Sequence, residues 1–183
     1  MTTLKGINGL HHYAYRCRNA EETRSFYEDL LGLPLAHVIQ ADSVPSTGAS
    51  DPYVHLFFEF TDGSYIAFFD LGDETACTPD PQTPDWVNHF AMQVGTVAEV
   101  EEWKKRLEEA GLDVVGVTDH GFVKSVYFFD PNGIRLEITC EVIDKSEREV
   151  YREGAQAALK AWTDSRPAPP TEFYRFRKEP ANA

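Results

Sequence analysis

Two histidines and one glutamate have the types and positions to hold a metal ion together. His12 and His89 each stand in a strand-like segment, and Glu137 stands in the middle of a third. Two imidazoles and one carboxylate from three strands form a facial arrangement that binds a divalent metal and leaves other positions open. A lone strand glutamate usually faces solvent. The three residues together nevertheless predict a metal site.

The strand that carries Glu137 belongs to a hairpin. Residues 123–129 are rich in β-branched and aromatic side chains, and the turn Asp130-Pro131-Asn132-Gly133 leads into residues 134–140. Side chains alternate along a strand, so Glu137 shares a face with Arg135 and Thr139 and lies opposite the apolar residues of the same strand. A carboxylate in so apolar a hairpin is costly to desolvate without a partner, which favours a cation beside it.

Strand and helix signals occur twice in the same order along the chain. The first unit has strands at 9–17, 35–40, 53–60 and 64–71, with a helix from an Asn19 cap to Gly32. The second has strands at 86–94, 112–117, 123–129 and 134–140, with a helix from a Thr96 cap to Gly111. We therefore predict two βαβββ units.

The two units align residue by residue at the candidate site. His12 and His89 each precede an aromatic residue by fourteen positions and a leucine by eighteen. Aligning Gly63 with Gly133 sets Phe57 against Tyr127 and Ala67 against Glu137. Neither unit of such a repeat closes its own core. We expect an α+β fold in which the two units pair into one curved mixed sheet, with helices outside and the metal ligands in its concave cup.

The predicted domain spans residues 1–142: module one at about 7–71, an acidic proline-containing linker at 72–85, and module two at 86–142. A C-terminal helix and tail follow at 143–183. Ser146 and Glu149 suggest the helix start, and its apolar stripe is expected to pack on the domain or on a second subunit. The stripe comprises Val150, Tyr151, Ala155, Leu159 and Trp162. Pro167, Pro169 and Pro170 end the helix, and the tail at 173–177 is expected on the surface.

Composition narrows the classes of partner. The net charge of −13 and the lack of a basic cluster argue against nucleic acid and anionic membranes. Cys17, Cys77 and Cys140 show no paired spacing, which predicts reduced thiols in a cytoplasmic protein. We find no signal peptide and no apolar run near the roughly 18 residues of a membrane span. A soluble intracellular protein is expected.

Three motifs carry a family resemblance: GLHHYAY at 9–15, VNHFAMQV at 87–94 and YFFDPNGIRLEIT at 127–139. The chain resembles the vicinal oxygen chelate superfamily over roughly residues 7–142. That superfamily includes glyoxalases, bleomycin-resistance proteins and extradiol ring-cleaving dioxygenases. The resemblance implies that His12, His89 and Glu137 bind the metal, in agreement with the argument from strand faces.

The resemblance also bears on the reaction. Ala67 stands where glyoxalase I and the acyl-CoA epimerases place a fourth, Glu or Gln ligand. A three-ligand site suits an extradiol dioxygenase that holds Fe(II) and acts on a small catechol-like or hydroquinone-like substrate with O₂. Mn, Ni or Zn are the alternative metals. A lyase, isomerase or thiol transferase of the same superfamily is the alternative activity.

Candidate catalytic residues follow from the same resemblance. Tyr127 lies ten positions before Glu137, where extradiol enzymes carry a tyrosine that hydrogen-bonds the substrate. His55 and His120 are the candidates for the acid/base. His11 precedes a metal ligand as in some hydroquinone-type ring cleavers, but strand alternation places it on the opposite face unless a bulge intervenes.

Two further alternatives stay open. A sequestering binder of the bleomycin-resistance type would need no metal, and its ligand binding would survive the loss of His12. The protein could also form a homodimer, with the C-terminal helix or a sheet edge as the interface.

Overall fold

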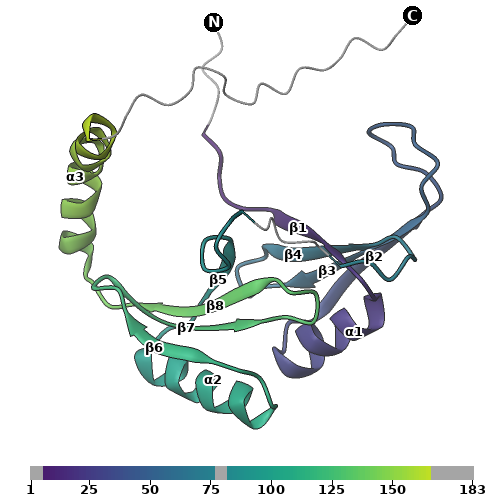
Figure 1. Ribbon diagram of the computed structural model, residues 1–183, viewed down its shortest axis with the longest axis horizontal. Helices are drawn as coiled ribbons and strands as arrows, with labels where there is room; N and C mark the ends of the chain where they lie inside the picture. The colour runs from purple at the N-terminus through teal and green to yellow at the C-terminus, as the bar shows by residue number, and fades with distance from the viewer. Residues whose placement is uncertain (1–5, 77–81, 166–183) are drawn as a thin grey trace, which may run out of the picture. The chain divides into compact units, whose positions relative to one another are not determined.

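The computed structural model describes residues 6–76 and 82–165 (Figure 1). Part of the predicted linker, Cys77, and the predicted tail with its prolines lie outside the described residues. The chain divides into two compact units between Val142 and Ile143. Each unit is described by itself.

The first unit contains two sheets of identical topology. The first sheet has the order β1-β4-β3-β2, and the second has the order β5-β8-β7-β6. In each, the first strand of the module runs parallel to the last, and the other pairs are antiparallel. The strands are β1 (His12–Cys17), β2 (Leu35–Ala41), β3 (Tyr53–Glu59), β4 (Tyr65–Asp70), β5 (His89–Gln93), β6 (Val115–Asp119), β7 (Val123–Phe129) and β8 (Arg135–Glu141).

This topology confirms the predicted α+β fold of two βαβββ modules. The strands form two four-stranded sheets, one in each module, where the sequence suggested one curved sheet shared by both modules. The helix α1 (Ala20–Arg24) continues as a π-helical segment, η1 (Ser25–Leu30), and module two carries α2 (Val97–Glu109). Asn19 and Thr96 cap these helices as predicted. Figure 1 shows a helix against one face of each sheet.

The strands β1, β5 and β6 begin three residues later than the sequence suggested. Val87 donates its N–H to the carbonyl of Pro84 in a turn, so β5 begins only at His89. Leu112 donates its N–H to the carbonyl of Leu107, so the chain is still bonded to α2 there and β6 begins at Val115. The hairpin strand β7 matches its predicted bounds.

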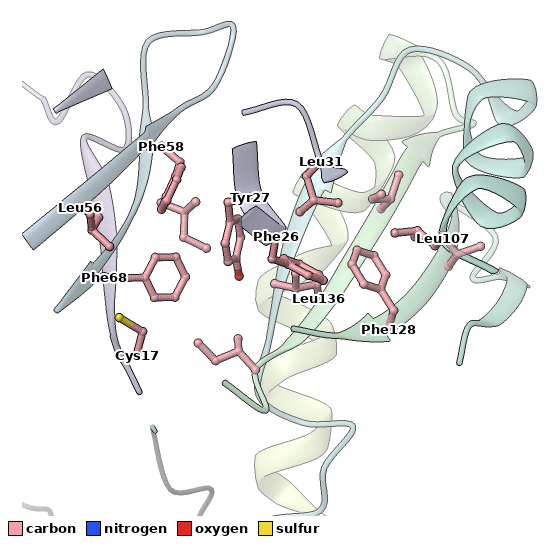
Figure 2. Packing of buried hydrophobic residues seen from close by; sticks show 14 of the residues in the cluster. Cys17, Phe26, Tyr27, Leu31, Leu56, Phe58, Phe68, Leu107, Phe128 and Leu136 are labelled. Atoms are coloured by element: carbon pink, nitrogen blue, oxygen red, sulfur yellow. The ribbon is translucent and has the colours of Figure 1, made fainter. Parts of the chain in front are cut away.

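One apolar core joins the two modules (Figure 2). Tyr27 of η1 is fully buried, and its ring lies between Phe68 of the first sheet and Phe26, which in turn approaches Phe128 of the second sheet. Leu107 of α2 belongs to the same cluster. Burying each large apolar side chain contributes about 1.5–3 kcal/mol, so this shared core holds the modules together. Cys17 and Cys140 are buried free thiols.

The turn of the second hairpin is bonded to the helix of module one. The hydroxyl of Tyr27 donates to Oδ2 of Asp130 at 3.1 Å. Asn132 accepts from the backbone N–H of Arg18 at 3.0 Å and donates to the hydroxyl of Thr23 at 3.2 Å. These buried contacts fix the hairpin that carries Tyr127 and Glu137 against the other module.

The second unit contains the helix α3 (Lys145–Asp164). Its capping box is formed by Asp144 and Glu147, two residues earlier than the predicted Ser146 and Glu149. The side chains of Val150 and Leu159 on the predicted stripe are exposed. The packing of this stripe on the domain or on a second subunit stays a prediction. Within the described residues, none of the helices is both long and apolar enough to span a membrane.

Candidate functional site

Each sheet has one face in the core and one face opposite to it, which we call the site face. In the first sheet the core face carries Leu56 and Phe58, and in the second it carries Val126 and Leu136. Strand alternation places the candidate residues on the site faces. The site face of the first sheet includes His12, Arg16, His55, Phe57, Tyr65 and Phe69. That of the second includes His89, Tyr127, Arg135 and Glu137.

His89 and Glu137 meet on the second sheet. Nε2 of His89 lies 3.0 Å from Oε2 of Glu137, and Nδ1 of His89 lies 3.1 Å from the carbonyl oxygen of Val87. Glu137 is only 5% exposed although it stands on the site face. One imidazole nitrogen and one carboxylate oxygen at a common point are the N and O ligands that divalent transition metals accept.

Tyr127 and His120 form a second polar pair beside the first. The Tyr127 hydroxyl lies 2.7 Å from Nε2 of His120, at the end of β6, and Tyr127 is the cross-strand neighbour of Glu137. Burial and the charge of Glu137 raise the pKa of the Tyr127 hydroxyl. The guanidinium of Arg135 lies 4.5 Å from the centre of the Tyr127 ring. A phenol and an imidazole at this distance can share a proton.

His12 stands on the first sheet among aromatic rings. Its Nδ1 lies 2.8 Å from Nδ1 of His11, and its ring centre lies 5.6 Å from Phe57 and 6.2 Å from His55. The β1 strand begins only at His12, so His11 lies outside the strand alternation. Its ring contacts Tyr65, the site-face partner of His12, contrary to the expected placement of His11 on the opposite face.

His55 is the most enclosed of the candidate histidines. It is 7% exposed, and its ring stacks on Phe69 with 3.6 Å between centres and contacts Phe57 at 4.1 Å. Burial, with the nearby His12 and His37, lowers the pKa of His55 to about 4. The imidazole is therefore neutral near pH 7.

The structure brings some predicted residues together and keeps others separate. His89 with Glu137, and Tyr127 with His120, are paired on the second sheet. His12 and His55 are near each other on the first. Within residues 6–76 and 82–165, no three His, Cys, Asp or Glu side chains are grouped closely enough to hold a metal ion. The three-residue site of His12, His89 and Glu137 therefore stays a prediction.

Two arginines of the site faces were missed from the sequence. Arg135 neighbours both His89 and Tyr127, and Arg16 stands on β1 four residues after His12. The signal that could have found them was present, because each shares its strand face with a candidate ligand. From a sequence alone, an arginine on a strand is usually interpreted as a solvent-exposed side chain, because most arginines in proteins are exposed.

Comparison with known proteins gives one family and several relatives. A model of the Glyoxalase/Bleomycin resistance protein/Dioxygenase superfamily matches residues 9–138. The chain is 27% identical over 143 residues to glyoxylase I 4 of Arabidopsis thaliana, covering 72% of this chain and 70% of that protein. It is 24% identical over 139 residues to the putative ring-cleaving dioxygenase MhqA of Bacillus subtilis, covering 74% of this chain but only 41% of that protein.

Solved structures share the fold. An integron cassette protein from a Halifax Harbour sewage metagenome is 26% identical with a TM-score of 0.51, covering 73% of this chain and 99% of that one. The fosfomycin resistance protein FosX of Listeria monocytogenes, solved with Mn(II) and a dihydroxypropylphosphonic acid, is 18% identical with a TM-score of 0.54 over 78% of this chain and 98% of its own. The family match at residues 9–138 reaches from the first motif into the third and spans well over half of the chain, so the chain belongs to the Glyoxalase/Bleomycin resistance protein/Dioxygenase superfamily.

Proposed function

We propose that this chain is a metal-dependent ring-cleaving dioxygenase of the extradiol type, acting on a small catechol-like or hydroquinone-like aromatic compound. The observation that carries the proposal is the pairing on the second sheet. Nε2 of His89 and Oε2 of Glu137 lie 3.0 Å apart, and beside them the Tyr127 hydroxyl lies 2.7 Å from Nε2 of His120. A pair of metal-type ligands next to a proton-sharing pair is what such a reaction needs.

His89 and Glu137 would hold the metal together with His12 of the first module. The N and O atoms of the pair fit a divalent first-row ion, and Fe(II) is the ion we propose. When bound, that ion would supply a template that orients the substrate's two oxygens beside O₂ and a path for electrons between them. Binding of this kind needs a neutral imidazole and a charged carboxylate.

The chain's own acid and base would be Tyr127 and His120. A substrate hydroxyl that becomes a metal ligand must lose its proton, and a hydroxyl–imidazole pair at 2.7 Å can accept and return it. We prefer His120 to His55 for this role because His120 contacts Tyr127 directly. Near the pair, the Arg135 guanidinium offers positive charge to a developing anion.

A lyase or isomerase of the glyoxalase type is the second candidate. The relationship to glyoxylase I 4 of Arabidopsis thaliana favours it. Ala67 argues against it, because the pairing of Ala67 with Phe57 repeats that of Glu137 with Tyr127, which places a side chain without ligand atoms at the equivalent position. The relationship to a putative ring-cleaving dioxygenase supports the first candidate.

Metal analysis combined with oxygen uptake tests the proposal. Protein purified without oxygen is expected to carry about one iron per chain and to consume O₂ on addition of a catechol or hydroquinone panel, with a new ring-fission absorbance. Bound zinc, nickel or manganese without oxygen uptake would favour the lyase or isomerase activity instead. Failure to retain any metal after reconstitution would leave a binding protein.

Replacing Tyr127 with phenylalanine tests the acid/base pair. The variant is expected to lower kcat by about a hundredfold to ten-thousandfold, the usual contribution of a positioned acid or base, while the bound metal stays unchanged. Turnover across a pH series, with metal content by plasma emission, is the measurement. Tyr65→Phe is the matched control, because the Tyr65 hydroxyl donates a long 3.4 Å bond to Glu59 on the first sheet. Equal loss in both variants would reject the role of Tyr127.

A further inference from the structure

Two nitrogen atoms on the site face of the first sheet are buried and lack a hydrogen-bond partner: Nε2 of His55 and Nε of Arg16. Leaving a buried polar atom unpaired costs free energy, and nearly all such atoms in folded proteins are satisfied. Among the described side chains on the core face of this sheet, no buried nitrogen or oxygen atom lacks a hydrogen-bond partner. Both atoms are therefore candidates for contact with a bound molecule.

The two residues that carry these nitrogens flank Phe69 in the sheet. Phe69 of β4 pairs with Arg16 of β1 on one side and with His55 of β3 on the other, so the three side chains form a row across the sheet. The imidazole of His55 stacks on Phe69 with an interplanar angle of 18°. The stacking fixes the ring of His55 and therefore the direction of its unpaired nitrogen.

One nitrogen of the Arg16 guanidinium already has a partner. Its Nη2 donates to both carboxylate oxygens of Asp73, and this contact holds the side chain in place. Nε remains as an unpaired N–H donor. Arginine is always protonated, so this nitrogen can only donate.

A cleft of about 670 Å³ adjoins the row. Tyr53, Phe69, Leu71 and Asp73 line it together with residues of the loop before β3. Its volume falls within the range of small-ligand sites. Phe69 belongs to both the cleft and the row, and Asp73 of the cleft is the carboxylate that binds Arg16. A group placed over Phe69 therefore has space beside it on this side of the sheet.

We propose that Arg16, Phe69 and His55 form a subsite for an acceptor oxygen on the aromatic substrate, a carbonyl or carboxylate attached to the ring away from its two hydroxyls. This inference rests on the proposed function for the position of those hydroxyls, which His12 would help to hold. The ring centres of His12 and His55 are 6.2 Å apart, so the two imidazoles are neighbours on the site face. The aromatic ring of the substrate would lie against Phe57, which contacts both His12 and His55.

The chemistry of the subsite selects the substituent. Arg16 Nε donates, and His55 can donate from Nε2, so the two residues offer N–H groups to an acceptor on this face of the sheet. A methyl group at the same position would leave both donors unpaired. Discrimination of this kind is larger than discrimination by size alone, because the unpaired polar atoms penalise the wrong ligand.

Equilibrium binding without oxygen tests the subsite independently of turnover. The ligands are catechol, ring-methylated catechol, protocatechualdehyde and protocatechuate, measured by titration calorimetry on anaerobically purified protein. We expect the two ligands with an acceptor to bind roughly tenfold to a hundredfold more tightly than the methylated one. Comparison of the aldehyde with the carboxylate shows whether the subsite takes a neutral or an anionic acceptor.

Substitution locates the effect. His55→Phe keeps the stack on Phe69 and removes the nitrogen, so the preference for an acceptor is expected to fall to within about twofold, and Arg16→Met is expected to reduce it as well. His37→Phe is the control, since His37 is an exposed histidine on the same sheet that contacts Phe57 at 5.6 Å. Its preference is expected to equal that of the unchanged protein.

Equal affinity for all four ligands, or a preference that survives in both His55→Phe and Arg16→Met, would overturn the subsite. Failure of the protein to bind any of the four would overturn it too. The proposed function fails by a different result, the lack of iron and oxygen uptake. A preference for the acceptor ligands in a protein without uptake would retain the subsite and reject the dioxygenase.

Discussion

Replacing Glu137 with alanine is expected to weaken metal binding by at least about a hundredfold and to abolish oxygen uptake. Loss of groups that only support a ligand already costs 10- to 100-fold in metal affinity, so the loss of a ligand should cost more. Glu137 is 5% exposed and its Oε2 lies 3.0 Å from Nε2 of His89, which makes it the enclosed anionic part of the pair. Metal titration monitored by calorimetry, followed by oxygen-electrode assays, measures both effects.

A second glutamate of the same strand provides the control. Glu141 follows Glu137 by four residues on β8 and shares its strand face, but it pairs with Val123 rather than with Tyr127. Glu141→Ala removes the same charge and is expected to leave metal affinity within about twofold, because long-range charge effects near a surface are small. If the two variants lose metal equally, the assignment of Glu137 as a ligand is wrong.

The repeat made most of the fold predictable. Residues 123–129 alternate between faces and are bounded by turn residues, and β7 has those bounds in the structure. The pairing of Phe57 with Ala67 repeats that of Tyr127 with Glu137, as aligning Gly63 with Gly133 predicts. Boundaries were less predictable where a turn or helix-end hydrogen bond competes with the strand, as at Val87 and Leu112.

The candidate site was predictable only at the level of strand faces. Alternation placed His89 and Glu137 on one face, and their 3.0 Å contact lies on it. The contact of His120 with Tyr127 depends on how the chain turns after β6, which strand periodicity does not describe. His11 was placed on the wrong face because the strand was expected to begin before it. The buried nitrogens of His55 and Arg16 depend on packing by neighbours from three strands, which no local pattern reveals.

The hairpin turn carries the second large predicted effect, which concerns stability. Asp130 is 6% exposed, and its two oxygens accept four hydrogen bonds. The donors are the Tyr27 hydroxyl, the backbone N–H groups of Asn132 and Ile134, and the side-chain amide of Asn132. Burial raises the pKa of Asp130, so the carboxylate is expensive to enclose and these donors offset that cost.

Asp130→Ala is therefore expected to lower the free energy of unfolding by about 3 kcal/mol or more, because several buried donors lose their acceptor at once. For a chain of this size the midpoint of thermal unfolding should fall by roughly 6–12 °C. Chemical and thermal denaturation followed by circular dichroism measure the change. Asp62→Ala is the matched control in the first hairpin, where the exposed carboxylate accepts from the N–H and hydroxyl of Ser64.

The control is expected to lose about 1 kcal/mol or less, since the Asp62 carboxylate is exposed and accepts two local hydrogen bonds where Asp130 accepts four buried ones. Part of the difference between the variants arises from Tyr27. Its hydroxyl joins η1 of module one to the turn of module two, and its ring lies between the sheets. Tyr27→Phe keeps the ring and removes that hydrogen bond, so it should lower the free energy of unfolding by part of the amount that Asp130→Ala does. Equal stability of Asp130→Ala and Asp62→Ala would mean that the apolar core alone joins the modules.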